Sequence, residues 1–134
     1  MIIDGTPVKR FDQWIELKES LHNKKNFPHF NEGEVWWVSV GENIGREING
    51  KSTLFSRPMV VYKKLSRELF LGIPTTSQDR IGTWYVPVTY STHKVTAVLS
   101  QVRTIDNRRL SSRIGQLNSD NFSKIKQGFT SLYT

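Results

Sequence analysis

The sequence contains no cysteine and no long apolar run. Without cysteine the chain has no disulfide bond, no zinc–thiolate centre and no thiol nucleophile, and this absence fits a reducing compartment. No stretch approaches the ~20 apolar residues that span a membrane, and the first residues lack the apolar core of a signal peptide. We therefore expect a soluble, cytoplasmic protein that does not enter a membrane.

Several catalytic patterns are also missing. The three histidines, His22, His29 and His93, have no second ligand at the spacing of a metal site. The chain has no G-x-S-x-G motif and no Walker-type phosphate loop. We expect no metal and no cofactor. His93 lies in a predicted turn, where it is either an acid–base group or a solvated turn residue.

Positive charge is in excess, with a net charge of +7 and a pI of about 9.9. This excess favours an anionic partner, with nucleic acid first and an acidic protein second. Many small domains are basic without such a partner, so the charge alone does not decide the function.

The chain has 134 residues, the length of one domain. Residues 10–24 are predicted to be helical because one apolar stripe recurs at helical spacing. The stripe consists of Phe11, Trp14, Leu17 and Leu21. We interpret residues 1–32 as a helical extension and connector that packs this stripe on the main body, and residues 33–134 as that body.

From residue 34 the pattern changes to short segments rich in β-branched and aromatic residues. Strands are predicted at 34–40, 57–64, 68–78, 82–90, 94–105 and 111–117, with Pro74 expected to stop the third. Short strands separated by turns favour a small β-barrel over a parallel α/β sheet. The predicted class is mainly β with helices (α+β).

The chain ends in a second predicted helix. Asn118 or Ser119 is expected to cap it, and Asp120 suits its first turn. Its apolar stripe consists of Phe122, Ile125, Phe129 and Leu132. Gly128 should weaken this helix by ~1 kcal/mol relative to alanine.

The glycine-broken loop at residues 41–56 carries several charges. Glu47 lies between two glycines, where it is either a general base or a solvated loop acid. Arg57 lies where this loop meets an apolar strand, so the strand would anchor a guanidinium whose fork matches phosphate oxygens. The alternative is an edge-strand arginine that is paired with an acid.

Polar residues also gather after the third strand, at Thr75, Thr76, Ser77 and Gln78. Their hydroxyls and amide suit phosphate oxygens or base edges, although polar strand ends are common. Trp36 and Trp37 are adjacent, so in a strand they point to opposite faces. We expect one in the core and the other on a partner surface or a base-stacking plane.

A basic run follows in "LSQVRTIDNRRLSSR". It holds four arginines, Arg103, Arg108, Arg109 and Arg113, with Asp106 as its single acid. Such a run suits the backbone of a nucleic acid, and the alternative is a solvated basic face.

Three of these segments together resemble a known family. "GEVWWVSVGENIGREINGK…SRPMVVYKK", "FLGIPTTSQ" and "LSQVRTIDNRRLSSRIGQL" occur in the order found in the MazF/PemK (Kid) toxins of bacterial type II toxin–antitoxin systems. The resemblance runs from about Gly33 to the end of the chain, and "VRTIDNRRL" is its most specific motif.

The resemblance implies a small SH3-like barrel of the MazF/PemK/CcdB type with a C-terminal helix, and a homodimer. It also implies a metal-independent endoribonuclease that cleaves single-stranded RNA by attack of the ribose 2′-hydroxyl on the neighbouring phosphate. The implied partner is a cognate antitoxin, and an acidic, flexible segment would suit the +7 charge of this chain.

The family's essential arginine corresponds to Arg57, its threonine or serine best to Thr76, and a glutamate used by some members to Glu47. The expected RNA-binding residues are Lys51, Thr75, Ser77, Gln78, Arg103, Arg108 and Arg109. One departure is the segment "KSTLFS" before Arg57, which is longer than in many members.

Two other functions stay open at this point. The chain could be a non-catalytic or gyrase-poisoning toxin of the CcdB type, or a housekeeping RNA-binding barrel. Arg57 and Thr76 together argue against a degenerate binding module, because neither is needed to fold a barrel.

Overall fold

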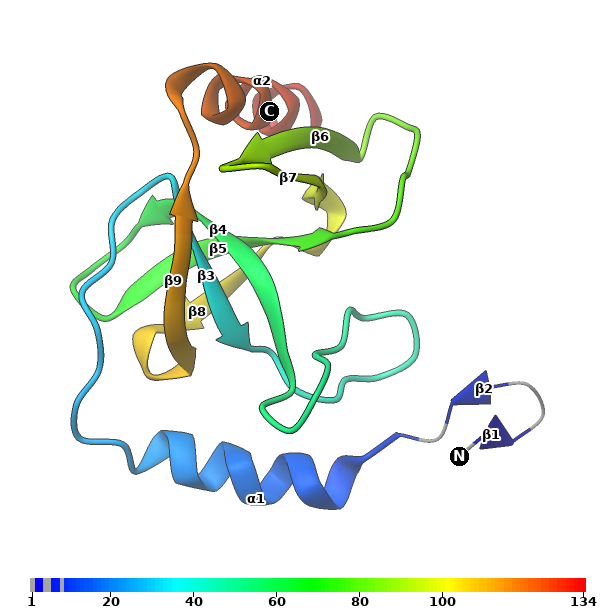
Figure 1. Cartoon of the computed structure of the whole chain (residues 1–134), viewed down its shortest axis with the longest axis vertical. Coiled ribbons are helices and arrows are strands. Elements are labelled where there is room, and N and C mark those ends of the chain that lie inside the picture. Colours follow the sequence, from blue (N-terminus) through cyan, green and yellow to red (C-terminus); the bar gives the residue numbers. More distant parts are fainter. Residues whose placement is uncertain (1, 4–5, 8) are drawn as a thin grey trace.

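The computed structural model of the chain describes residues 2–3, 6–7 and 9–134 (Figure 1). Its elements are β1 (Ile2–Ile3), β2 (Thr6–Pro7), α1 (Phe11–His22), β3 (Glu34–Ser39), β4 (Ser56–Lys64), β5 (Leu69–Thr76), β6 (Tyr85–Tyr90), β7 (His93–Val98), β8 (Arg103–Asp106), β9 (Leu110–Gln116) and α2 (Ser119–Tyr133). The class is mainly β with two helices, as the sequence predicts.

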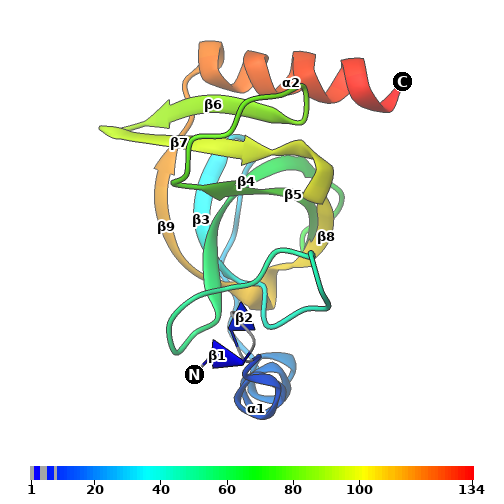
Figure 2. The same ribbon diagram turned by 90° about the vertical axis from the view of Figure 1, so that its right-hand side faces the viewer.

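One antiparallel sheet curls to form the body of the protein. Its strand order is β6-β7-β5-β4-β3-β9, and β8 also pairs with β5. β1 pairs only with β2, in a separate two-stranded ribbon. The views in Figures 1 and 2 show the curved barrel with α1 at one end and α2 at the other.

β5 pairs with β4, β7 and β8. Two sequence predictions about β5 and its partners are wrong. Pro74 does not stop the strand, which continues to Thr76. The expected strand at 94–105 is interrupted by a 3-10 turn at Leu99–Gln101, so β7 pairs with one end of β5 and β8 with the other. Pro74 lies opposite Met59 of β4, and on the other edge of β5 it falls between the β7 and β8 pairings, so neither of those two ladders needs its missing N–H. The sequence conceals the interruption because Leu99 is fully buried although it lies outside a strand.

Successive side chains of β3 and β4 point to opposite faces of the sheet, and they contribute to two apolar cores, one on each face. Trp36 and Met59 belong to one core, and Val35 and Val60 to the other. The indole N–H of Trp36 donates a hydrogen bond of 3.0 Å to buried Glu34, so the polar edge of this core residue is satisfied.

α2 covers the second core through buried Ile125, and it begins as predicted. Asn118 is its cap, and the side chain of Asn118 accepts a bond of 2.9 Å from the backbone N–H of Asn121. Gly128 has a structural role as well as a cost. A Cβ at this position would lie 2.9 Å from Leu99 Cδ1 and 3.1 Å from Val86 Cγ2, so glycine lets the helix lie close to the barrel.

α1 contacts the body less extensively than its apolar stripe predicts. Trp14 is buried, whereas Phe11 is 44% exposed.

No helix in the described ranges is both long and apolar enough to span a bilayer.

Phe30, which precedes the expected start of the body, is fully buried in the first core. Its ring centroid lies 4.9 Å from that of Phe70. The substitution Phe30→Ala should therefore lower the free energy of unfolding by about 3–5 kcal/mol, measured by urea denaturation.

The matched control is Phe11→Ala, because Phe11 is an exposed residue outside both cores. It should change the free energy of unfolding by no more than about 0.5 kcal/mol. Equal losses in the two variants would contradict the placement of Phe30 in the core.

Candidate functional site

A groove of about 810 Å³ opens beside the start of β4 and the end of β5. Its lining consists of Trp37, Lys51, Ser52, Leu54, Ser56, Arg57, Pro58, Thr75, Ser77, Tyr90, His93, Lys94, Val95, Ser111, Ser112 and Ile114. Two lysines and one arginine belong to this lining and no carboxylate does. A groove with this composition attracts anions.

Arg57 is held in the groove by backbone carbonyls. Its Nε donates to the carbonyl oxygen of Asn49 at 2.8 Å, and one terminal nitrogen donates to that of Thr75 at 3.3 Å. Across the described part of the chain, Arg57 forms no ion pair with an acid. Burial lowers the pKa of Arg57 from its usual value, and a guanidinium still stays protonated at neutral pH. Its charge is therefore oriented and remains available for an anion.

The predicted polar cluster at the end of β5 divides between two directions. Thr75 and Ser77 line the groove, and Thr76 and Gln78 do not belong to its lining. The Thr75 hydroxyl donates to the carbonyl of Pro58 at 3.0 Å, so its hydrogen is used. The Thr76 hydroxyl oxygen accepts from the backbone N–H of Gln78 at 3.2 Å, which leaves its hydrogen free for a ligand.

The two tryptophans of β3 point to opposite faces, as predicted. Trp36 is the core residue and is buried, whereas Trp37 is the surface residue: it is 40% exposed and lines the groove. Trp37 lies opposite Pro58 in the ladder, whereas Arg57 lies opposite Val38, and Trp37 adds an aromatic plane to the groove that Arg57 also lines.

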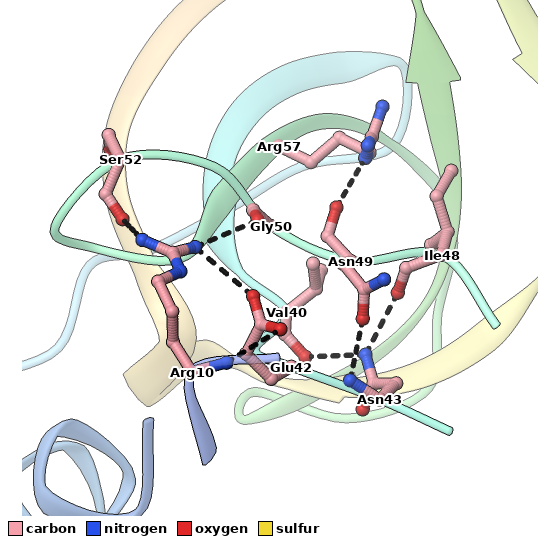
Figure 3. Close-up of polar contacts among 9 residues, drawn as sticks. All are labelled: Arg10, Val40, Glu42, Asn43, Ile48, Asn49, Gly50, Ser52 and Arg57. Carbon is pink, nitrogen blue, oxygen red and sulfur yellow. Dashed lines mark hydrogen bonds and ion pairs between the residues drawn. The ribbon is translucent and has the colours of Figure 1, made fainter. Parts of the chain in front are cut away.

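The segment at residues 51–56 forms one wall of the groove. Lys51, Ser52 and Leu54 line the groove, and Lys51 and Ser56 close the segment by a pair of backbone bonds. At the base of the loop, the side-chain amide of Asn43 donates to the carbonyl of Ile48 at 2.8 Å (Figure 3). The glycine-bent loop is thus an ordered wall.

Glu47 lies outside this groove. Its carboxylate accepts a bond of 2.9 Å from the backbone N–H of Ile44 in its own loop. It lines a second hollow together with Arg103, and the charge of Glu47 offsets part of the effect of burial, which lowers the pKa of Arg103. The structure therefore brings Glu47 to Arg103 and not to Arg57.

The other two predicted arginines lie at α1. Arg108 forms a two-pronged ion pair with Asp106 at 2.9 Å and also donates to the carbonyl of His22. Asp106 has a pKa below its ordinary value, chiefly because of its hydrogen bond to Arg108. Arg109 lies 5.7 Å from the ring centroid of Trp14, and burial lowers its pKa. Neither side chain lines the groove of Arg57.

Sequence reasoning missed Lys94 and the carbonyl of Asn49. Lys94 follows His93 directly, and the tight turn after Tyr90 brings both side chains to the groove. The hairpin spacing could have indicated this, because it fixes the register of β6 and β7. A carbonyl oxygen that orients an arginine leaves no signal in a sequence.

The structure offers little for a metal ion. In residues 9–134 and the four described before them, no three His, Cys, Asp or Glu side chains cluster as ligands would.

Solved structures of similar fold include MazF and two complexes with an antitoxin or with MazE. MazF (Form-I) from Deinococcus radiodurans has a TM-score of 0.59 at 20% identity, covering 81% of this chain and 97% of that one. The MazE–MazF complex (Form-II) from the same organism has a TM-score of 0.57 at 16% identity, covering 81% and 96%. An endoribonuclease in complex with its cognate antitoxin from Mycobacterial species has a TM-score of 0.57 at 15% identity, covering 75% and 90%. At these identities the likeness concerns the fold alone.

A search of curated protein sequences found no significant match. A family model does match: that of the PemK-like, MazF-like toxins of type II toxin–antitoxin systems, over residues 31–133. The match spans well over half of the chain and confirms the resemblance seen in its motifs. The chain therefore belongs to the PemK-like, MazF-like toxin family of type II toxin–antitoxin systems.

Proposed function

We propose that this toxin is a metal-independent endoribonuclease that cleaves single-stranded RNA. The observation that carries the proposal is Arg57, a half-buried cation that faces an acid-free groove and is bonded only to carbonyls among the described residues. A phosphodiester supplies the anion that this arrangement lacks. Family membership supports the same activity.

In the proposed reaction the ribose 2′-oxygen attacks the adjacent phosphorus, and the bond from phosphorus to the 5′-oxygen breaks. The products are a 2′,3′-cyclic phosphate and a 5′-hydroxyl. One proton leaves the 2′-hydroxyl and one reaches the 5′-oxygen. Arg57 stabilises the charge that develops on the phosphorane. Thr76 lies outside the lining of the groove, between Thr75 and Ser77, which line it, and its free hydroxyl hydrogen would donate to a non-bridging oxygen of RNA that reaches past this edge of the groove.

The rest of the groove suits an RNA strand. Lys51 and Lys94 lie on its lining, where they would contact neighbouring phosphates. Trp37 offers a plane on which a base would stack. The +7 net charge adds a long-range attraction for RNA and for an acidic, flexible antitoxin segment. The homodimer that the family resemblance implies stays a prediction.

Arg57→Ala should reduce RNA cleavage at least a hundredfold, because removal of one preorganised donor costs on the order of 3 kcal/mol. The measurement is the cleavage rate of a long single-stranded RNA in the presence of a metal chelator, with cut sites mapped. Circular dichroism should show an unchanged fold. Equal trace cleavage by wild type and Arg57→Ala would sink the proposal, and gyrase inhibition without RNA cleavage would favour a CcdB-type toxin.

Thr76→Val and Thr75→Val separate the two adjacent hydroxyls. Because the Thr75 hydroxyl already donates to Pro58 and that of Thr76 has a free hydrogen, Thr76→Val should slow cleavage about tenfold to a hundredfold. Thr75→Val should act mainly on stability, by about 1 kcal/mol. The cleavage rates and the urea midpoints of both variants are the measurements. Slow cleavage by Thr75→Val with normal cleavage by Thr76→Val would assign the phosphate-binding hydroxyl to Thr75.

The base that accepts the 2′-proton is tested by Glu47→Gln and His93→Gln. His93 shares the groove of Arg57, and Glu47 lies in the hollow of Arg103. We expect His93→Gln to lower the cleavage rate by about 10²-fold or more, the typical contribution of a general base, with a smaller effect of Glu47→Gln. The opposite order would restore Glu47 as the base.

A further inference from the structure

The loop wall of the groove has an unfavourable backbone. Ser52 and Phe55 are not glycine, yet their φ angles are +65° and +49°, in the left-handed region. Gly50 cannot be replaced without movement, since a Cβ there would lie 1.7 Å from the carbonyl oxygen of Phe55. Such a conformation persists only when surrounding contacts hold it.

Arg10, just before α1, contacts both Ser52 and Phe55, and Figure 3 shows its hydrogen bond to Ser52. Its guanidinium donates to the carbonyl of Ser52 at 2.9 Å and lies 4.0 Å from the ring centroid of Phe55. It also donates to the carbonyl of Gly50 at 3.4 Å. One side chain thus holds three points of the loop.

The Glu42 side chain fixes Arg10 in turn. This carboxylate is 7% exposed, and it accepts from both the backbone N–H and the guanidinium of Arg10, at 3.2 and 3.1 Å. Trp14 of α1 also packs against the loop. Its ring centroid lies 5.6 Å from that of Phe55, and a Cβ on Gly41 would lie 2.1 Å from the Trp14 ring.

Arg57 and Arg10 bind adjacent residues of the same loop. The carbonyl of Asn49 accepts from Arg57 Nε, and the carbonyl of Gly50, the next residue, accepts from Arg10. A shift of the loop at Gly50 would therefore displace the oxygen that orients Arg57. Figure 3 shows the two arginines on this one stretch of loop.

We propose that Arg10 is a positioning residue for the RNA-cleaving groove: it holds the strained loop wall and, through Asn49, sets the orientation of Arg57. The inference rests on the proposed function for its consequence in catalysis. It gives the segment before the family match, which begins at residue 31, a role in the site.

The test compares Arg10→Ala with Lys18→Ala, which removes an equal charge from an exposed position of α1. Amide hydrogen exchange should become faster at residues 50–56 in Arg10→Ala, with β5 and α2 unchanged. Single-turnover cleavage at saturating RNA should fall by up to about a hundredfold, because small displacements of a catalytic group have effects of that size. Lys18→Ala should behave as wild type in both measurements.

Arg10→Ala leaves the buried carboxylate of Glu42 without its partner, so a second variant removes that effect. Arg10→Ala/Glu42→Gln should regain stability and still cleave slowly. Arg10→Lys keeps the charge but not the fork, and its cleavage rate should lie between those of wild type and Arg10→Ala.

Unchanged exchange at residues 50–56 in Arg10→Ala and in the double variant would overturn the inference, whether or not the wild type cleaves RNA. Full cleavage activity in the double variant, with an active wild type and an inactive Arg57→Ala, would overturn it as well and leave the proposed function standing. A wild type that does not cleave RNA would overturn the proposed function, and the exchange at residues 50–56 would still decide whether Arg10 holds the loop.

Discussion

The central constraint in this molecule is that Arg57 keeps its charge in a half-buried position with carbonyl oxygens as its protein partners. A carboxylate partner would neutralise the guanidinium, and full exposure would leave its direction unfixed. Two carbonyl oxygens orient the guanidinium and leave its charge in place. They come from Asn49 in the loop and Thr75 in β5, so both segments must be fixed in place for the charge to be useful.

The barrel fixes the β5 side of this arrangement. Thr75 is almost fully buried, its hydroxyl is bonded to Pro58, and its backbone pairs with β7. β5 continues through Pro74, which pairs with Met59 of β4 where β5 has neither β7 nor β8 on its other edge. The site therefore stands at the place where β5 exchanges one edge partner for another, and this exchange brings the β6–β7 hairpin with His93 to the same groove.

Patterns of single residues predicted much of this fold. Alternation placed the strands of the body, with Trp36 inside and Trp37 outside, and helical spacing placed both helices. The errors arose where tertiary pairing outweighed local preference: Pro74 inside a strand, and buried Leu99 in a turn that looks like a strand. For the site, local position identified Arg57, Lys51, Thr75 and Ser77 for the groove. It did not show that Glu47 faces another hollow or that Arg108 and Arg109 contact α1, because those outcomes depend on how distant segments meet.

Two segments that lie outside the most specific family motif meet in space. One is the loop before Arg57, which the sequence resemblance predicts to be longer than in many members, and the other is the segment that precedes the family match at residue 31. Arg10 and Trp14 of that segment contact the loop at Gly50, Ser52 and Phe55. A longer loop has more conformations to lose, and two of its residues adopt unfavourable ones. A loop of this kind can orient Arg57 only if something rigid holds it, so the N-terminal segment and the loop before Arg57 act together as one structural unit.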